Sequence, residues 1–185
     1  MTHSLLNFVE EATIIETPRL YLRLMSPLVF KKLMTQFPDE IIMAILGKAN
    51  KEELAAEKEK FEKGLSTFNR SYHYFQLIDK ESLQVIGWCG YHTWYFPHFR
   101  AELGYELFKE EWRNKGLMKE ALTPIIRFGF EVMELNRIEA FVSPNNVPSQ
   151  KLIWHFGFQE EGLMRQHYNF EDSQIFSLLK ADYNG

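Results

Sequence analysis

The first part of the chain shows two hydrophobic periods in succession. Apolar and polar residues alternate toward the end of residues 13–24, where the apolar positions are Leu20, Leu22 and Leu24. A period of two predicts a β-strand over this segment. Ser26 and Pro27 follow, and a serine directly before a proline is typical of a helix start. We therefore expect a helix from there to about Gln36.

Three further elements are predicted before the middle of the chain. Residues 51–68 are rich in Glu, Lys and Ala and carry Leu54, Phe61 and Leu65 on one stripe, which predicts a surface helix. Residues 72–78 and 83–95 have the composition of strands and are separated by a short polar turn at residues 79–82. Two strands joined by such a turn predict a β-hairpin.

The next segment is a strand whose two faces differ, followed by a long helix. In residues 100–108 the apolar side chains lie on one face, whereas Glu102 and Glu106 share the other. Residues 116–135 repeat apolar positions at helical intervals, although an interior proline, Pro124, can cost about 3 kcal/mol. We expect a kink there, or a helix that strong packing maintains. A short strand at residues 137–142 completes a βαβ unit, whose strands should be parallel.

A short helix at residues 147–156 and one or two strands ending at residues 175–180 complete the predicted elements. Strands and helices alternate, so the fold class is α/β (α+β). The 185 residues are expected to form one domain, 1–185, because a domain typically contains about 100–200 residues. In such sheets ligands bind at the helix starts that follow parallel strands.

Composition narrows the classes of function. A net charge of -4 argues against broad nucleic-acid binding, which needs a basic face. The N-terminus has no basic region typical of a secretory signal, and no apolar stretch approaches the roughly 20 residues that span a bilayer. The single cysteine, Cys89, is expected to be a small buried hydrophobic residue, and the six histidines show no metal-ligand spacing. We expect a cytoplasmic protein without a metal site.

The most informative stretch is residues 110–121, where Gly116 stands beside the cations Arg113 and Lys115 just before the long helix. A turn of this kind presents unpaired backbone N–H groups to whatever lies in front, which suits a phosphate. Taken alone, the same pattern also fits an ordinary solvated turn.

Several motifs, in this order and spacing, resemble the GCN5-related N-acetyltransferase (GNAT) superfamily along nearly the whole chain. The motifs are Arg113-x-x-Gly116-Leu117, Asn146-x-x-Ser149 and Gly157-Phe158. The phrases at residues 17–23, 101–105 and 177–180 are similar to the branch that contains the ribosomal-protein N-terminal acetyltransferases.

The resemblance implies a strongly twisted mixed sheet of six or seven strands with about four flanking helices. The sheet should be splayed between residues 100–108 and residues 137–142, with acetyl-CoA in the splay. The pantetheine arm would pair with the first of these strands, and the pyrophosphate would bind the loop before the long helix. The residues assigned to acetyl-CoA in this way are Leu107, Phe108, Lys109, Arg113, Asn114, Lys115, Gly116, Leu117, Met118, Asn146 and Ser149.

Two positions depart from the family pattern. Met118 stands where the family usually has a glycine or alanine that lets backbone approach phosphate, and we expect its side chain to point into the core. Ile153 stands where many relatives carry a tyrosine that could protonate the leaving thiolate.

Acetyl transfer to an amine needs a base, a polarised carbonyl and an acid for the thiolate. For the base we favour Glu102, which could equally be a solvated strand carboxylate, with Glu106 as second choice. For the acid we favour Ser149, whose alternative role is to cap the helix at residues 147–156; Tyr168 is a further candidate. The backbone N–H of Leu107 or Phe108 would polarise the thioester.

The sequence therefore predicts an acetyl-CoA-dependent N-acetyltransferase that acts on a protein N-terminal α-amine, as in the ribosomal-protein branch, or on a small primary amine. The alternative is a CoA-binding sensor or interaction module that has lost transfer activity. The acceptor, the acyl chain length and the choice between monomer and homodimer stay open.

Overall fold

The computed structural model describes residues 13–62 and 73–184. Their strands form one eight-stranded sheet in the order β1-β2-β3-β4-β5-β6-β8-β7. Only the β5–β6 pair is parallel. The strands are β1 (Ile14–Glu16), β2 (Leu20–Met25), β3 (His73–Asp79), β4 (Val85–Tyr95), β5 (Arg100–Leu107), β6 (Arg137–Val142), β7 (Gln159–Tyr168) and β8 (Glu171–Leu179).

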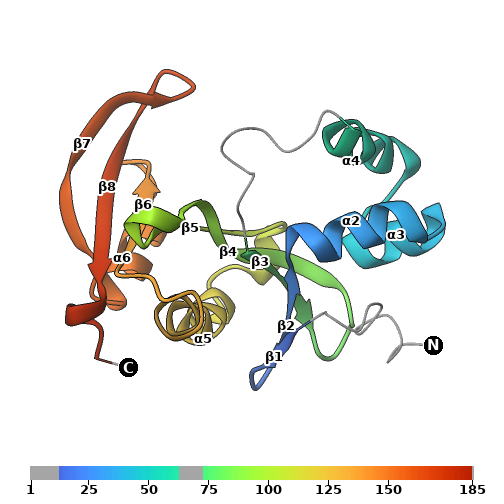
Figure 1. The fold of residues 1–185 in the computed structure, drawn as a ribbon, viewed down its shortest axis with the longest axis horizontal. Helices are drawn as coiled ribbons and strands as arrows, with labels where there is room; N and C mark the ends of the chain where they lie inside the picture. Colours follow the sequence, from blue (N-terminus) through green and yellow to red (C-terminus); the bar gives the residue numbers. More distant parts are fainter. Residues whose placement is uncertain (1–12, 63–72, 185) are drawn as a thin grey trace.

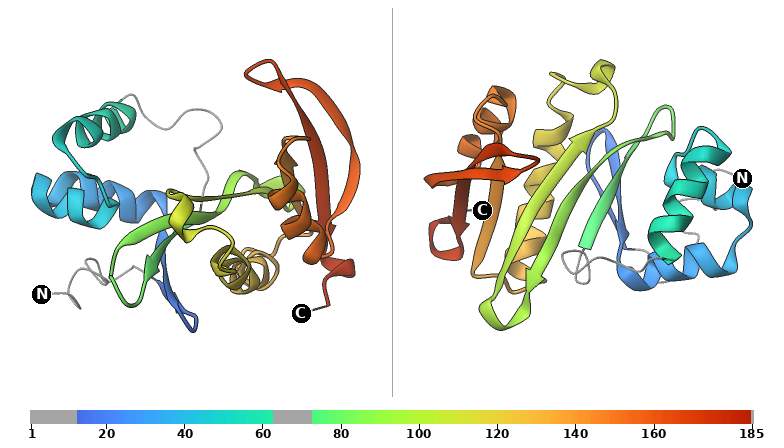
Figure 2. Two further views of the ribbon diagram at one scale, coloured as in Figure 1. Left: turned by 180° about the vertical axis from the view of Figure 1, so that it is seen from behind. Right: turned by 90° about the horizontal axis from the view of Figure 1, so that it is seen from above.

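The α-helices of the described part are α2 (Pro27–Gln36), α3 (Asp39–Leu46), α4 (Lys51–Glu62), α5 (Leu117–Glu131) and α6 (Val147–His155). Figure 1 shows α5 beneath the central strands, with α2 to α4 gathered at one end of the molecule and the β7–β8 hairpin at the other. Figure 2 shows the same separation from behind and from above. The helix between β5 and β6 is α5, so the predicted parallel βαβ unit is confirmed.

The mixed α/β architecture was predicted, but the structure contains more elements than the sequence indicated. The single strand expected over residues 13–24 is two antiparallel strands, β1 and β2, because the chain turns at residues 17–19, where the Thr17 N–H donates to the Leu20 carbonyl at 2.9 Å. The C-terminal segment supplies two strands. The sheet therefore has eight strands in place of six or seven.

Helix α3 was not predicted, although its sequence carries helix signals. Pro38 precedes the helix, Asp39 and Glu40 occupy its first turn, and Gly47 ends it with a φ of 67°. Acidic residues at a helix start and a left-handed glycine at its end are typical boundaries. With α3 the described part has five α-helices in place of about four.

Other local predictions are confirmed. The Ser26 hydroxyl caps α2 by accepting from the Val29 N–H at 3.3 Å. The β3–β4 turn is closed by Asp79, whose carboxylate accepts from the Ser82 N–H at 2.8 Å. The predicted helix at residues 51–68 is seen as far as Glu62; its remainder and the predicted strand residue Tyr72 lie outside the described residues.

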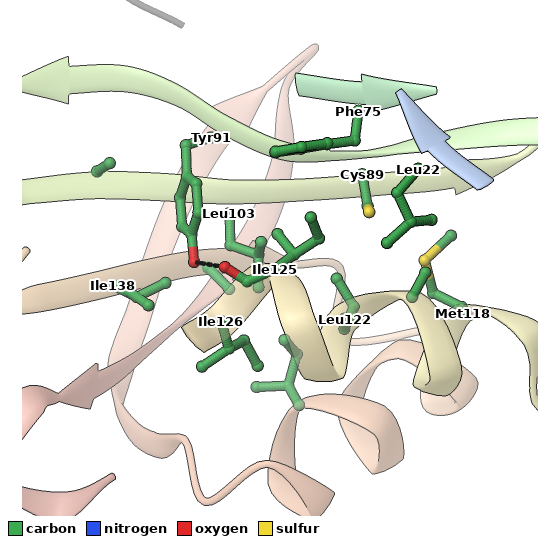
Figure 3. Packing of buried hydrophobic residues seen from close by; sticks show 14 of the residues in the cluster. Leu22, Phe75, Cys89, Tyr91, Leu103, Met118, Leu122, Ile125, Ile126 and Ile138 are labelled. Atoms are coloured by element: carbon green, nitrogen blue, oxygen red, sulfur yellow. Dashed lines mark hydrogen bonds between the residues drawn. The ribbon is translucent and has the colours of Figure 1, made fainter. Parts of the chain in front are cut away.

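The main hydrophobic core lies between α5 and one face of the sheet. Figure 3 shows Phe75, Cys89, Tyr91 and Leu103 on the sheet facing Ile125 on α5. Cys89 is fully buried, and burial raises the pKa of its thiol, as expected for a small hydrophobic residue without a nucleophilic role.

Helix α5 continues through Pro124 from Leu117 to Glu131 without interruption. Most of one face is buried, and the Tyr91 hydroxyl donates a hydrogen bond to the Ile125 carbonyl at 2.9 Å. A Cβ built on Gly129 would lie 2.3 Å from that hydroxyl oxygen, so only glycine leaves room for the tyrosine. Packing thus maintains the helix despite its proline, one of the two expected outcomes.

A second apolar cluster lies on the opposite face of the sheet. There α2 and α3 cover the β2 end, with Met25, Leu33 and Ile42 fully buried. The helices do not continue over β5 and β6, so the face that carries Glu102 is left to other elements.

Candidate functional site

The two parallel strands at the centre of the sheet separate after a short paired stretch. Pairing between β5 and β6 runs only from Arg100 opposite Arg137 to Glu102 opposite Glu139. Both strands continue for several residues beyond that point, β5 to Leu107 and β6 to Val142. The sheet is therefore splayed between the two strands for which the family resemblance implied it, and Glu102 lies at the vertex of the splay.

Beyond the vertex, β5 presents unpaired backbone groups to the opening. The Phe108 N–H donates to the Ile86 carbonyl at 3.0 Å, in continuous register with the pairing of Glu102 with His92. Because antiparallel partners alternate, the backbone groups of Leu103, Tyr105 and Leu107 point away from β4 and into the splay. The Phe108 N–H is thus committed to β4, so of the two candidates only the Leu107 N–H faces the opening.

The loop before α5 has the shape that the glycine and the cations predicted. Gly116 adopts a φ of 76°, and Asn114 also has a left-handed φ of 59°. No side chain caps α5 at Gly116. The first turn of the helix therefore presents its backbone amides toward the solvent side of the loop, as an anion site requires.

The cationic side chains of this loop are exposed and held only by weak surface pairs. Arg113 lies 3.9 Å from Glu110, and Lys109 lies 3.6 Å from Glu111. Lys115 lies over the Trp112 ring, 5.5 Å from its centroid. Exposed pairs of this kind are worth about 0–1 kcal/mol, so these side chains can turn toward an anion at little cost.

Arg19 at the start of β2 braces this loop, a role that the sequence did not reveal. Its guanidinium donates to the Lys115 carbonyl at 3.0 Å and pairs with Glu120 at 2.7 Å. The Thr17 hydroxyl also donates to Glu120, at 2.6 Å. Burial alone would raise the pKa of Glu120, but these hydrogen bonds lower it below its ordinary value. The carboxylate thus stays charged and fixes the helix start against the sheet.

Met118 has its side chain in the main core, as expected. It is 8% exposed and lies with Leu22 and Leu122 beside Cys89 in Figure 3. The side chain therefore does not occupy the solvent side of the loop, and only its backbone is available to a phosphate.

Glu102 sits in a partly buried pocket with a raised proton affinity. Its side chain is 12% exposed, and burial raises its pKa to about 7. A hydrogen bond from the Thr93 hydroxyl at 3.4 Å opposes this rise, and the charge of Glu139 adds to it. A carboxyl with a pKa near neutrality can exchange protons at physiological pH, which is what a general base needs.

His92 lies directly across from Glu102 in the β4–β5 pair, with Nδ1 at 3.5 Å from a Glu102 oxygen. Burial lowers the pKa of His92, so at neutral pH the ring faces the carboxylate as an uncharged group. The same Nδ1 lies 3.2 Å from the Thr93 hydroxyl oxygen. Because that hydroxyl donates to Glu102, its oxygen is free to accept a hydrogen from His92.

Glu139, opposite Glu102 across the vertex, is neutralised by two guanidinium groups. Arg100 lies 2.6 Å from one of its oxygens and Arg137 2.8 Å from the other. Arg137 also pairs with Glu161 at 2.5 Å, and this interaction lowers the pKa of Glu161 to about 2. Among the described residues, no arginine or lysine pairs with Glu102 in this cluster.

Glu106, the second candidate base, is placed differently. Its carboxylate accepts from the Trp88 indole N–H at 3.3 Å, and its residue is exposed. It lies four paired positions farther along β5, away from the vertex. Glu102 is therefore better placed to act where the strands separate.

Ser149 and Asn146 lie at the start of α6, beside the splay. The Asn146 side chain, not Ser149, caps the helix: it accepts from the Ser149 N–H at 3.2 Å. The alternative of a capping serine is thus wrong, and the Ser149 hydroxyl is left for another role. The Tyr105 hydroxyl lies 3.5 Å from the Ser149 carbonyl, which links α6 to β5 across the opening. Ile153 is fully buried and cannot serve as an acid.

Among the described residues, no group of three or more His, Cys, Asp or Glu side chains is placed to hold a metal ion. Within the same ranges, no helix is long and apolar enough to cross a membrane.

Comparisons with known proteins agree with this geometry. A family model described as an acetyltransferase (GNAT) domain matches residues 19–159. Over 115 residues the chain is 44% identical to the uncharacterized N-acetyltransferase p20 of Bacillus licheniformis, covering 60% of this chain and 64% of that protein. Over 118 residues it is 35% identical to the ribosomal protein uS5-alanine N-acetyltransferase of Escherichia coli (strain K12), covering 61% of this chain and 60% of that protein. The matches thus span less than two thirds of these relatives.

A solved structure shares the fold over a greater length. The ribosomal-protein-S5-alanine acetyltransferase from Vibrio fischeri superposes with a TM-score of 0.65 at 22% identity, covering 94% of this chain and 100% of that one. The chain belongs to the GNAT acetyltransferase domain family. The resemblance seen in its motifs is confirmed, and its class of enzyme is acetyltransferase.

Proposed function

We propose that this protein transfers an acetyl group from acetyl-CoA to a primary amine, with Glu102 as the general base. The observation that carries the proposal is the position of Glu102: a partly buried carboxylate with a pKa of about 7 at the point where β5 and β6 separate. Acetyl-CoA supplies the thioester that the amine attacks. The raised pKa lets Glu102 accept the proton that the amine must lose.

The binding role of the loop and strand rests on the groups they expose. The amides of the first turn of α5, together with Arg113 and Lys115, form a site for a diphosphate that needs no metal. The unpaired edge of β5, at Tyr105 and Leu107, offers backbone partners to an amide-containing arm. The remaining contacts to acetyl-CoA would come from the backbone of Asn114, Leu117 and Met118. Lys109 would contribute from the surface nearby.

Acetyl transfer requires two proton transfers, and we assign both to residues of this chain. A bond forms between the amine nitrogen and the acetyl carbon, the carbon–sulfur bond breaks, and the amine proton passes to Glu102. The departing thiolate takes a proton from the Ser149 hydroxyl, which lies beside the splay and has no capping role. Ser149 regains a proton from solvent and Glu102 releases the amine proton to solvent, so both residues return to their starting states. The Leu107 N–H polarises the carbonyl during attack.

For the acceptor we propose an α-amine at a protein N-terminus, because a relative of this chain is named for acetylating the alanine of a ribosomal protein. The proposal also fits the charge of the vertex. Two arginines neutralise Glu139. Among the described residues of this cluster, Glu102 is then the carboxylate without an arginine partner, and it would face the amine. A small primary amine is the alternative acceptor.

A titration with acetyl-CoA followed by a thiol-release assay tests the proposal. Calorimetry on the purified protein should show saturable binding, and an alanine- or serine-initiated peptide should then release CoA thiol. Small monoamines and diamines, added separately, distinguish the acceptor classes. Binding without thiol release from any amine would contradict transfer and favour a CoA-binding module. Failure to bind acetyl-CoA would refute both readings.

A further inference from the structure

Two irregular segments, distant in the sequence, converge on Glu102. One is the bulge in β4 after His92, where pairing with β5 is interrupted until Tyr95. The other is the bulge in β7, where residues 165–167 lie opposite a single residue of β8. Each bulge directs one hydroxyl toward the same carboxylate.

Thr93 occupies the first bulge in a conformation that threonine rarely adopts. Its φ is 51°, in the left-handed region, and a β-branched residue there is a genuine outlier. The result is that its hydroxyl points across to Glu102, 3.4 Å from Oε2. In a regular strand the residue after His92 would face the opposite side of the sheet from Glu102. Strain of this kind persists where the surrounding structure requires it, and it gathers at functional sites.

Tyr168 reaches Glu102 from the β7–β8 hairpin, on the other side of the vertex. Gln166 has a φ of 51°, and its N–H donates to the Asp172 carboxylate at 2.8 Å, which fixes the bulge. The neighbouring His167 ring packs on Phe141 of β6, with centroids 4.7 Å apart, and on Tyr168 itself at 4.3 Å. The hairpin is thereby anchored on β6, which brings the Tyr168 hydroxyl near Glu102, where it lowers the pKa of that carboxyl.

We propose that Thr93 and Tyr168 are positioning residues that hold the Glu102 carboxylate at the vertex from opposite sides. Their two bulges turn a strand carboxylate into an oriented base. Tyr168, a candidate acid from the sequence, is thus assigned to the positioning of Glu102. The assignment rests on the proposed function for its catalytic meaning, but the contacts themselves belong to the free protein.

A titration of the Glu102 carboxyl also depends on the titratable and charged groups that face it. They are His92 on β4, Glu139 on β6 with its partners Arg100 and Arg137, and Tyr168 with His167 on β7. Both hydroxyls stabilise the charged carboxylate, so removing either should raise the pKa of Glu102, whereas Glu139 acts in the opposite direction.

The test is a carbon-13 NMR titration of the Glu102 carboxyl in the full-length protein without acetyl-CoA, with the signal assigned by its loss in Glu102→Gln. Thr93→Val keeps the shape of threonine but removes the hydroxyl, and Tyr168→Phe removes only the phenolic oxygen. Each should raise the pKa of Glu102 by about half a unit. Thr93→Ser, which keeps the hydroxyl, and Tyr21→Phe, far from the vertex on β2, should leave it unchanged.

Two further measurements, one of them on an additional variant, test the same proposal. Thr93→Gly removes both the hydroxyl and the strained side chain, so it should unfold at a higher urea concentration while still raising the pKa of Glu102. In turnover assays, the acidic limb of the kcat/KM profile should move upward with the NMR value, which lowers kcat/KM about threefold on that limb for a shift of half a unit.

An unchanged Glu102 titration in both Thr93→Val and Tyr168→Phe would overturn the proposal, as would a Thr93→Gly protein that is less stable than the wild type. If the carboxyl titration moves as expected but no amine is acetylated, the positioning contacts stand and the proposed acetyl transfer fails.

Discussion

The two faces of the β4–β5 pair are built from alternating residues of the same two strands, yet they have opposite properties. One face carries Cys89, Tyr91, Ala101 and Leu103, all buried against α5. The other carries His92 and Glu102, with polar contacts and a strained neighbour at Thr93. The comparison teaches that one strand pair can supply both the rigid packing that fixes a site and the costly polar groups that give it chemistry.

The physical reason lies in what each face is packed against. The apolar face meets a continuous helix, which excludes water and makes every buried methylene stabilising. The polar face lies beyond the reach of α2 and α3 and meets the splay and the β7–β8 hairpin (Figure 2). Burial there raises the pKa of Glu102, an unfavourable arrangement for folding that is useful for catalysis.

The largest effect should come from removing the charge on the polar face. Glu102→Gln keeps the side-chain shape but cannot accept the amine proton, so kcat/KM should fall about 10²- to 10⁴-fold. Steady-state thiol release between pH 6 and 9 measures it. Glu131→Gln, an exposed change at the far end of α5, is the matched control. Near-normal turnover of Glu102→Gln at every pH would remove Glu102 from the mechanism.

The same carboxylate should make stability depend on pH. Because the folded protein holds this proton more tightly than the unfolded chain does, Glu102 destabilises the fold progressively as pH rises from about 4.5 to about 7. At about 1.4 kcal/mol per pKa unit, the full rise corresponds to an upper figure of about 3 kcal/mol.

Urea unfolding of the wild type and Glu102→Gln at pH 4.5 and pH 8 checks this dependence. The variant should gain stability relative to the wild type at pH 8 and little at pH 4.5. A difference between the two proteins that does not change with pH would show that Glu102 titrates normally in the folded state.

On the apolar face, the sharpest test is Gly129→Ala. Helix propensity alone predicts about 1 kcal/mol of added stability, but the new Cβ would lie 2.3 Å from the Tyr91 hydroxyl oxygen. We expect the clash to prevail, with a net loss of about 2–3 kcal/mol in the free energy of unfolding.

Thr123→Ala, at an exposed position of the same helix, supplies the matched measure of propensity. Combining Gly129→Ala with Tyr91→Leu should recover part of the loss, because the smaller side chain no longer meets the new methyl group. A Gly129→Ala protein that is more stable than the wild type would show that Tyr91 does not need the space above this helix.

The smallest effect should come from the loop before α5, which we propose to bind the diphosphate of acetyl-CoA. Arg113→Gln removes one exposed cation and should weaken binding of acetyl-CoA about tenfold, or about 1.4 kcal/mol. Binding of acetyl-pantetheine, which lacks the phosphates, should not change. Calorimetry with both ligands measures the difference, with Arg127→Gln as control. Equal weakening for both ligands would place Arg113 away from the phosphates.

Local patterns predicted most of the fold. Period-two alternation identified β5 and its two faces, and the cap at Ser26 and the turn at Asp79 set boundaries that the structure confirms. Two features of the fold differ from the prediction, for different reasons. The sequence of α3 carries ordinary helix-boundary residues, so that helix was predictable. The division between β1 and β2 depends on how the two strands pair, which alternation along the chain does not show.

The candidate site was predicted less completely, because its residues come from unconnected segments. The strand face narrowed the base to Glu102 and Glu106, and only the position of the splay favours Glu102 over Glu106. Nothing in the sequence around Thr93 indicates a left-handed threonine, and Tyr168 lies 66 positions from Glu102. The bond from Arg19 to the Lys115 carbonyl likewise joins residues 96 positions apart.

The sequence by itself determined the order of strands and helices, the glycine between cations, the face on which Glu102 lies and the family to which the chain belongs. The elements and the strand face follow from periodicity and local backbone preference, which act over a few residues, whereas the family follows from the resemblance of its motifs. Only the tertiary structure decided that the strands separate just beyond Glu102, that Asn146 caps α6 and that two bulges bring Thr93 and Tyr168 to one carboxylate. Burial and close contact between distant segments set those features, and such contacts exist only once the chain is folded.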